Sequence, residues 1–219
     1  MTLKALIFDF DGLILDTESP IYYAIRDVYQ QYGFAFPLDE YTYCIGSYED
    51  TGHFLHKLRE KMQTPLNFEQ LLTQINTTML QNVNSSTALP GVVNLLEQAK
   101  TAGLECLVAS SSSYDWVNSQ LTRLGLRHFF THVCTSDDVQ HVKPEPDLFL
   151  LALSRANIQA NEAIIFEDSA NGILAAFRAG IFRIAVPNPM TQHLDFSKAN
   201  MVLKRIDEVP VNELLTKVI

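Results

Sequence analysis

Short apolar runs alternate with amphipathic segments along most of this chain. Five runs have the length and composition of strands: 4–9, 104–109, 132–135, 163–167 and 182–186. Segments with helical periodicity follow them: 90–102, 114–125, 146–156, 171–179 and a last one near 211–218. Strands that alternate with helices are typical of βαβ units. The sequence therefore predicts an α/β fold with a Rossmann-like, doubly wound parallel sheet.

The interval 17–87 breaks this alternation. It contains no strand-like run, and its periodicity predicts helices near 18–32, 49–62 and 67–83. Because it is far longer than an ordinary loop, we expect an inserted helical cap domain over 17–87. The α/β core would then comprise 1–16 and 88–219. Seven of the eight tyrosines lie between Tyr22 and Tyr48, either in the helical core of this insertion or around a substrate pocket.

The charge and cysteine content of the chain argue against some kinds of binding partner and indicate its compartment. A net charge of −9 argues against nucleic-acid or anionic-membrane binding, and no apolar run reaches the length of a membrane span. The three cysteines, at 44, 106 and 134, have no metal-binding spacing, as expected for reduced thiols in a cytoplasmic protein. We expect a cytoplasmic monomer that binds neither nucleic acid nor membrane.

Polar residues follow four of the predicted strands. Asp9 and Asp11 follow the first, Ser110 the second, Lys143 the third, and Glu167-Asp168 ends the fourth. Singly, each has an ordinary explanation as a turn or a helix cap. Together they would gather at the carboxyl edge of a parallel sheet, where open α/β folds bind ligands. Carboxylates gathered there favour a hard, oxygen-seeking cation such as Mg2+.

This order of residues resembles the four motifs of the haloacid dehalogenase superfamily of phosphohydrolases. The resemblance implies that Asp9 is the nucleophile and a metal ligand, and that Asp168 is a second ligand. It also implies that Asp11 binds the metal through its backbone carbonyl and acts through its side chain as general acid and base. Ser110 and Lys143 would bind the phosphoryl group. Glu167 would contact the metal directly, act through water or orient Asp168.

Within the superfamily, the inserted segment is similar to that of β-phosphoglucomutases and small sugar-phosphate phosphatases. This chain has Ile21 and Tyr48 where the mutases have a histidine and an arginine, and the segment 17–87 has eight acidic against four basic residues. We therefore expect a Mg2+-dependent phosphatase acting on a small phosphorylated metabolite. The alternatives are a sugar phosphomutase and a noncatalytic binding module. Five residues are expected to contact substrate: Thr17, Glu18, Ser47, Tyr48 and Ser111.

Overall fold

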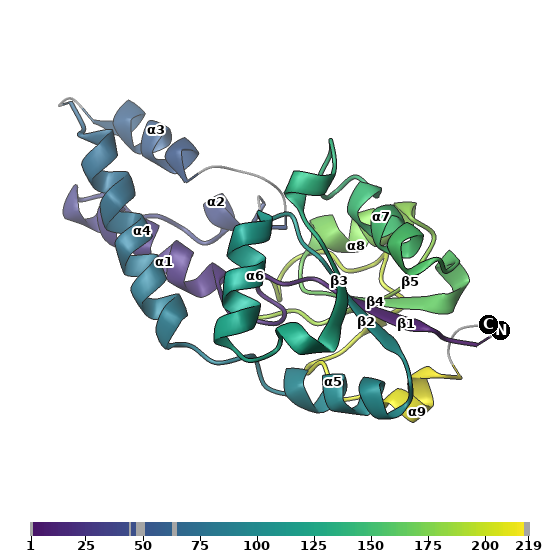
Figure 1. Cartoon of the computed structure of the whole chain (residues 1–219). Helices are drawn as coiled ribbons and strands as arrows, with labels where there is room; N and C mark the ends of the chain where they lie inside the picture. Colours follow the sequence, from purple (N-terminus) through teal and green to yellow (C-terminus); the bar gives the residue numbers. More distant parts are fainter. Residues whose placement is uncertain (1, 44, 47–50, 63–64, 217–219) are drawn as a thin grey trace.

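The chain forms a six-stranded parallel sheet that carries a group of helices at one end (Figure 1). The computed structural model describes residues 2–43, 45–46, 51–62 and 65–216. The strands are β1 (Ala5–Phe8), β2 (Glu105–Ala109), β3 (Phe130–Cys134), β4 (Ala163–Glu167), β5 (Phe182–Ala185) and β6 (Met201–Val202). Their spatial order is β3-β2-β1-β4-β5-β6. This is the Rossmann-like, doubly wound arrangement that the sequence predicts.

The first strand lies at the centre of the sheet. It pairs in parallel with β2 on one side and β4 on the other, so that Phe8 is opposite both Val108 and Phe166. All four side chains of β1 are fully buried, because helices cover both faces of the sheet. The residues that follow β1, β2 and β4 are thereby brought to one edge.

Helices of the core pack on both faces of the sheet. They are α5 (Val92–Thr101), α6 (Tyr114–Arg123), α7 (Asp147–Ala156), α8 (Ala170–Arg178) and α9 (Val211–Leu214). Successive residues of β1 alternate between the faces, as strand geometry requires. Leu6 and Phe8 join the cluster beneath α5 and α6, whereas Ala5 and Ile7 join the cluster beneath α7 and α8.

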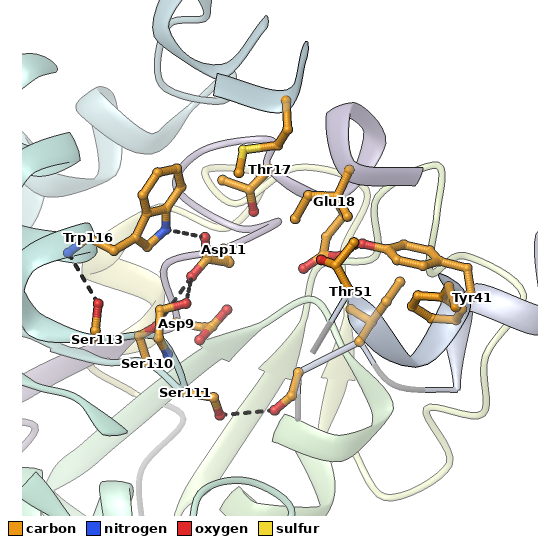
Figure 2. Close-up of a pocket in the computed structure, with 16 residues that line it drawn as sticks. Asp9, Asp11, Thr17, Glu18, Tyr41, Thr51, Ser110, Ser111, Ser113 and Trp116 are labelled. Carbon is orange, nitrogen blue, oxygen red and sulfur yellow. Dashed lines mark hydrogen bonds between the residues drawn. The ribbon is translucent and has the colours of Figure 1, made fainter. Parts of the chain in front are cut away.

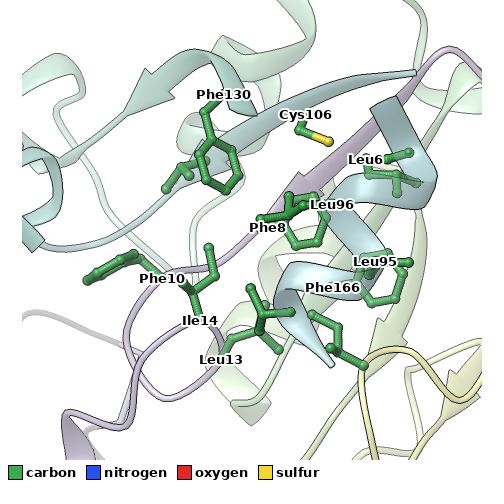
Figure 3. Packing of buried hydrophobic residues seen from close by; sticks show 14 of the residues in the cluster. Leu6, Phe8, Phe10, Leu13, Ile14, Leu95, Leu96, Cys106, Phe130 and Phe166 are labelled. Atoms are coloured by element: carbon green, nitrogen blue, oxygen red, sulfur yellow. The ribbon is translucent and has the colours of Figure 1, made fainter. Parts of the chain in front are cut away.

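Phe8 is a fully buried member of the hydrophobic cluster beneath α5 and α6 (Figure 3). Its ring stacks on Phe166 at a centroid distance of 5.4 Å and meets the edge of Phe130 at 5.9 Å. Leu95 and Leu96 of α5 belong to the same cluster. This packing fixes the end of β1 immediately before Asp9.

The described residues of the segment after β1 form four helices with a hydrophobic cluster of their own. They are α1 (Glu18–Gln31), α2 (Asp39–Thr42), α3 (Gly52–Lys61) and α4 (Phe68–Ser85). Tyr29 is fully buried in this cluster, and Met190 from the core side also contributes to it. We keep the division into a core and a cap over 17–87 as a proposal.

Several boundaries differ from those predicted. The strand expected at 132–135 begins at Phe130, and Met201–Val202 and Asp39–Thr42 form elements that were not expected. The last helix ends at Leu214, earlier than expected. Three-residue 3-10 helices at 127–129, 136–138 and 160–162 complete the structure. None of the helices in the described ranges is both long and apolar enough to cross a membrane.

Candidate active site

The carboxyl edge of the sheet gathers the charged residues that the sequence singled out. Asp9 directly follows β1, and its backbone N–H donates to the carbonyl of Phe166 at 3.0 Å. Ser110 follows β2, while Glu167 is the last residue of β4 and Asp168 follows it. Oxygen atoms of Asp9, Glu167 and Asp168 lie within 4.8 Å of one another, and all three residues are buried.

Lys143 reaches this cluster from the segment before α7. Its ammonium group donates to Asp9 Oδ1 at 2.5 Å and to Glu167 Oε1 at 2.6 Å, and its side chain is completely buried. Burial alone would lower the pKa of Lys143, but the two carboxylates raise it above its usual range. Lys143 is therefore held as a cation beside Asp9.

One lysine does not balance three buried carboxylates. When ionised, Asp9, Glu167 and Asp168 with Lys143 carry a formal charge of −2. Burial raises the pKa of Asp9 well above its usual range; Lys143 opposes this rise, and the neighbouring carboxylates add to it. Burial likewise raises the pKa of Asp168, and the charges of Glu167 and Asp9 add to that rise. A buried excess of negative charge is costly unless a cation compensates it.

The unpaired oxygen of Asp168 indicates where such a cation would fit. Asp168 Oδ2 accepts a hydrogen bond of 2.7 Å from Asn188 Nδ2. Asp168 Oδ1 is buried and has no hydrogen-bond partner among the described residues. Glu167, in contrast, accepts from Lys143 through Oε1 and from the backbone and hydroxyl of Ser169 through Oε2. An all-oxygen donor set with one orphaned carboxylate oxygen fits a hard divalent cation such as Mg2+.

The side chain of Asp11 has hydrogen-bond partners other than the residues of this cluster (Figure 2). Its Oδ2 accepts from the hydroxyl of Ser112 at 2.6 Å and from that of Ser110 at 3.3 Å. Its Oδ1 accepts from Trp116 Nε1 at 2.9 Å. The carboxylates of Asp9 and Asp11 are two residues apart in sequence, yet they have separate sets of partners.

A pocket of about 380 Å³ opens in front of Asp9 and Asp11. The core side contributes these two aspartates, the serine run 110–113 and Trp116; the cap side contributes mainly apolar and hydroxyl-bearing residues. The cap-side lining consists of Thr17, Glu18, Ile21, Tyr41, Ile45, Gly46, Thr51, Phe54 and Met79. No lysine, arginine or histidine is found among the described residues that line this pocket.

Glu18 is the charged residue that the described part of the segment 17–87 contributes to the pocket lining. It is buried, and its Oε2 accepts a hydrogen bond of 2.5 Å from the hydroxyl of Tyr41. Burial raises the pKa of Glu18 to about 7, against the opposing effect of the Tyr41 hydrogen bond. Near neutral pH this side chain can both donate and accept hydrogen bonds.

Direct contacts join the segment 17–87 to the rest of the chain beside the pocket. Ser111 Oγ donates to the carbonyl of Gly46 at 3.0 Å, and Asn171 Nδ2 donates to that of Ile45 at 2.9 Å. Thr42 Oγ1 lies 3.1 Å from His193 Nε2. Ser111, expected to contact substrate, thus lines the pocket and also binds the cap backbone.

The predicted site residues are distributed as follows. Asp9, Asp11, Thr17, Glu18, Ser110 and Ser111 line the pocket, and Lys143, Glu167 and Asp168 are buried behind it. Ser47 and Tyr48 lie outside the described residues. Sequence reasoning missed Ser112, Trp116, Tyr41 and Asn188. The serine run 110–113 gave some indication of Ser112, and the Pro-Asn-Pro segment after β5 could have indicated Asn188.

A family model and several known proteins match this chain. The model of the family described as haloacid dehalogenase-like hydrolase matches residues 6–186. A Bacillus subtilis protein named "Putative phosphatase YhcW" is 39% identical over 97% of this chain and 96% of its own. The fructose-1-phosphate phosphatase YqaB of Escherichia coli is 33% identical over 83% of this chain and 95% of its own. The phosphorylated carbohydrates phosphatase of Thermotoga maritima is 31% identical over 83% and 84%, respectively.

Solved structures show the same architecture. CbbY from Rhodobacter sphaeroides in complex with phosphate superposes with a TM-score of 0.74 at 25% identity, covering 94% of this chain and 96% of that one. The β-phosphoglucomutase of Clostridium difficile gives a TM-score of 0.76 at 23% identity, covering 97% and 95%. At that identity the second likeness concerns the fold alone.

Proposed function

The chain belongs to the haloacid dehalogenase-like hydrolases, and from this premise we propose that it is a Mg2+-dependent phosphatase of small sugar monophosphates. The observation that carries the proposal is the buried cluster around Asp9. Lys143 donates to Asp9 and Glu167 there, and Asp168 Oδ1 has no hydrogen-bond partner within the described part of the chain. A carboxylate held beside the Lys143 ammonium group and close to a carboxylate oxygen that could bind a metal ion is suited to attack a phosphate dianion.

The metal ligands in this proposal are the carboxylates of Asp9 and Asp168 and the backbone carbonyl of Asp11. Glu167 contacts the ion directly or through water, or orients Asp168. When bound, Mg2+ would neutralise charge on the phosphoryl group and reduce its repulsion by the nucleophile. The three clustered carboxylates and the orphaned Asp168 Oδ1 support this assignment.

Asp9 is the proposed nucleophile. Its carboxylate oxygen forms a bond to phosphorus while the ester P–O bond breaks, and the leaving oxygen takes a proton from Asp11. Water then attacks the phosphorus and gives a proton back to Asp11, which releases inorganic phosphate and restores the Asp9 carboxylate. Ser110 donates a hydrogen bond to a phosphoryl oxygen, and Lys143 supplies positive charge beside Asp9.

The lining of the pocket supports a substrate with one phosphate and a neutral, hydroxyl-rich remainder. Thr17, Glu18 and Ser111 offer hydrogen-bonding groups to such a remainder, and Ser47 and Tyr48 complete the proposed set. A phosphomutase must hold a second phosphate group, yet the described lining offers no basic side chain for it. Relatives named fructose-1-phosphate phosphatase and phosphorylated carbohydrates phosphatase favour the same substrate class over the mutase alternative.

The proposal extends to the compartment, the oligomeric state and the role of the segment 17–87. We propose that the enzyme acts as a cytoplasmic monomer without nucleic-acid or membrane partners, and that 17–87 is a cap that closes over the pocket. Cys106 and Cys134 are free and buried, which supports a reducing compartment. The contacts of Ser111 and Asn171 with the cap backbone support a closing role for the insertion.

A panel of sugar monophosphates tests the proposal. Release of inorganic phosphate should require Mg2+, should stop after chelation and should resume when Mg2+ is restored. Asp9→Asn should fold like the wild type and release no phosphate. Glucose 1-phosphate supplied with a sugar bisphosphate primer should yield phosphate and no glucose 6-phosphate. Full turnover in demetallated enzyme would contradict the metal assignment, and production of glucose 6-phosphate would identify a mutase.

A further inference from the structure

Trp116 makes a polar contact with the proposed acid–base residue. It lies in the first turn of α6, where its backbone N–H donates to the capping hydroxyl of Ser113 at 3.4 Å. Its indole Nε1 donates to Asp11 Oδ1 at 2.9 Å, and its ring lines the pocket (Figure 2). It is the only tryptophan in the chain.

The two oxygens of Asp11 have chemically different partners. Oδ2 accepts from the hydroxyls of Ser112 and Ser110, and a hydroxyl can reverse its role and accept a hydrogen bond instead. Oδ1 accepts from Trp116, and an indole N–H can only donate. A proton on Oδ1 would make that oxygen a poorer acceptor and weaken this bond, whereas a proton on Oδ2 leaves the bond from the indole intact. The exchangeable proton therefore belongs on Oδ2.

This asymmetry has a consequence for catalysis. A general acid must present its proton to the leaving oxygen within hydrogen-bonding distance. A carboxyl group that rotates freely would present either oxygen, with or without the proton. The indole of Trp116 anchors Oδ1 and leaves Oδ2 to exchange the proton with the serine hydroxyls, the leaving oxygen or water.

We propose that Trp116 is a positioning residue that fixes the orientation of the Asp11 carboxyl group for proton transfer. The inference rests on the proposed function, in which Asp11 is the general acid and base. It gives the indole a role beyond packing, because Trp116 also contacts the hydrophobic cluster that contains Phe8. A positioning role and a packing role predict different results when the indole N–H is removed. Loss of positioning lowers kcat/KM mainly for substrates whose leaving group must be protonated, whereas loss of packing lowers it for all substrates.

The test compares leaving groups in Trp116→Phe, which retains an aromatic ring and removes the indole N–H. A sugar alkoxide needs protonation as it leaves, whereas 2,4-dinitrophenolate does not. We expect kcat/KM for a sugar monophosphate to fall about tenfold or more, and that for 2,4-dinitrophenyl phosphate to fall less than about threefold. Tyr114→Phe, which removes an exposed hydroxyl from the same turn of α6, should leave both values unchanged.

A double-mutant cycle tests whether Trp116 affects kcat/KM through Asp11. In an Asp11→Asn background, Trp116→Phe should produce no further decrease in kcat/KM for the sugar phosphate, because the acid that it orients is already absent. Equal losses for both substrates, full additivity in the cycle, or an unchanged Trp116→Phe enzyme would each overturn the proposal.

A spectroscopic measurement separates this inference from the proposed function. Since Trp116 is the only tryptophan, its fluorescence emission reports its surroundings without any turnover. Asp11→Ala removes the acceptor of the indole N–H and should shift the emission maximum or change its intensity. An unchanged spectrum would overturn the contact itself. If Asp11→Ala changes the spectrum but the wild-type enzyme hydrolyses no phosphate ester, the proposed function fails while the contact stands.

Discussion

Gly12 leaves the space that the Asp168 carboxylate occupies: a Cβ atom built on Gly12 would lie 2.3 Å from Asp168 Oδ2. The same glycine has a φ angle of +78°, a conformation that side-chain-bearing residues rarely adopt. Its carbonyl accepts from Asn188 Nδ2 at 3.1 Å, and the same amide nitrogen donates to Asp168. Gly12 thus leaves space for the Asp168 carboxylate of the proposed metal site, and its carbonyl helps to hold the Asn188 amide that donates to Asp168.

Gly12→Ala should therefore weaken Mg2+ binding. The added methyl group must displace Asp168 or Asn188, and displacement of such supporting groups typically costs about 10–100-fold in metal affinity. Calorimetric titration with Mg2+ measures the effect. Gly33→Ala is the matched control, since its φ is +79° and an added Cβ meets no atom of the described residues within 4 Å. The two variants should share a similar backbone strain of about 1–2 kcal/mol. Equal Mg2+ affinity in both would contradict the proposed ligand role of Asp168.

Glu18 should make the stability of the enzyme depend on pH. Its pKa is raised from 4.5 to about 7 in the folded state, so between these values the folded protein binds a proton that the unfolded chain does not. The contribution of this group to the free energy of unfolding then falls as pH rises through that window. From about pH 5 to about pH 8, Glu18→Gln should gain about 2 kcal/mol relative to wild type.

Urea unfolding of both proteins at the two pH values measures this difference. The exposed residue Glu60 on α3 provides the control, because Glu60→Gln should follow the wild type at both pH values. A constant difference between wild type and Glu18→Gln would contradict a raised pKa of Glu18 in the folded state.

Asn171 should stabilise the closed position of the cap. Its side-chain amide donates to the carbonyls of Ile45 and Tyr43, at 2.9 Å and 3.3 Å. Asn171→Ala removes both bonds, each with a typical net value of about 1 kcal/mol. KM for the sugar phosphate should rise about fivefold or more, and amide hydrogens in α2 should exchange faster with deuterated water.

Asn82→Ala supplies the control for this experiment. It removes a side-chain hydrogen bond within α4, from Asn82 to the carbonyl of Thr78, and should change neither KM nor exchange in α2. The same exchange rates in Asn171→Ala and wild type would mean that these bonds do not hold the cap.

The sequence predicted the central strands well because both faces of this sheet are covered, so that its strands read as continuous apolar runs. Met201–Val202 was missed because a two-residue edge strand, with Val202 58% exposed, leaves no such run. The start of β3 was placed two residues late because exposed Thr131 separates buried Phe130 from the rest of the strand.

Site residues that directly follow a strand could be predicted from the sequence, whereas contacts made by side chains on helices could not. Asp9, Ser110 and Asp168 follow strands directly, so strand order alone predicts that they meet. Trp116 lies one turn into a helix, and its contact with Asp11 depends on the direction of a side chain that no spacing in the sequence specifies. The hydrogen bond between Tyr41 and Glu18 joins two different helices of the insertion, and it likewise depends on how those helices pack.

The most direct test of the account is to find where the phosphoryl group goes. Wild-type enzyme should be mixed with Mg2+ and a sugar monophosphate, quenched rapidly in acid, reduced with borohydride and digested for mass spectrometry. Reduction converts a phosphorylated aspartate into homoserine, so the account predicts homoserine at position 9 and unmodified aspartate at positions 11 and 168. A modified residue other than Asp9, or rapid phosphate release with no modified residue at any quench time, would contradict it.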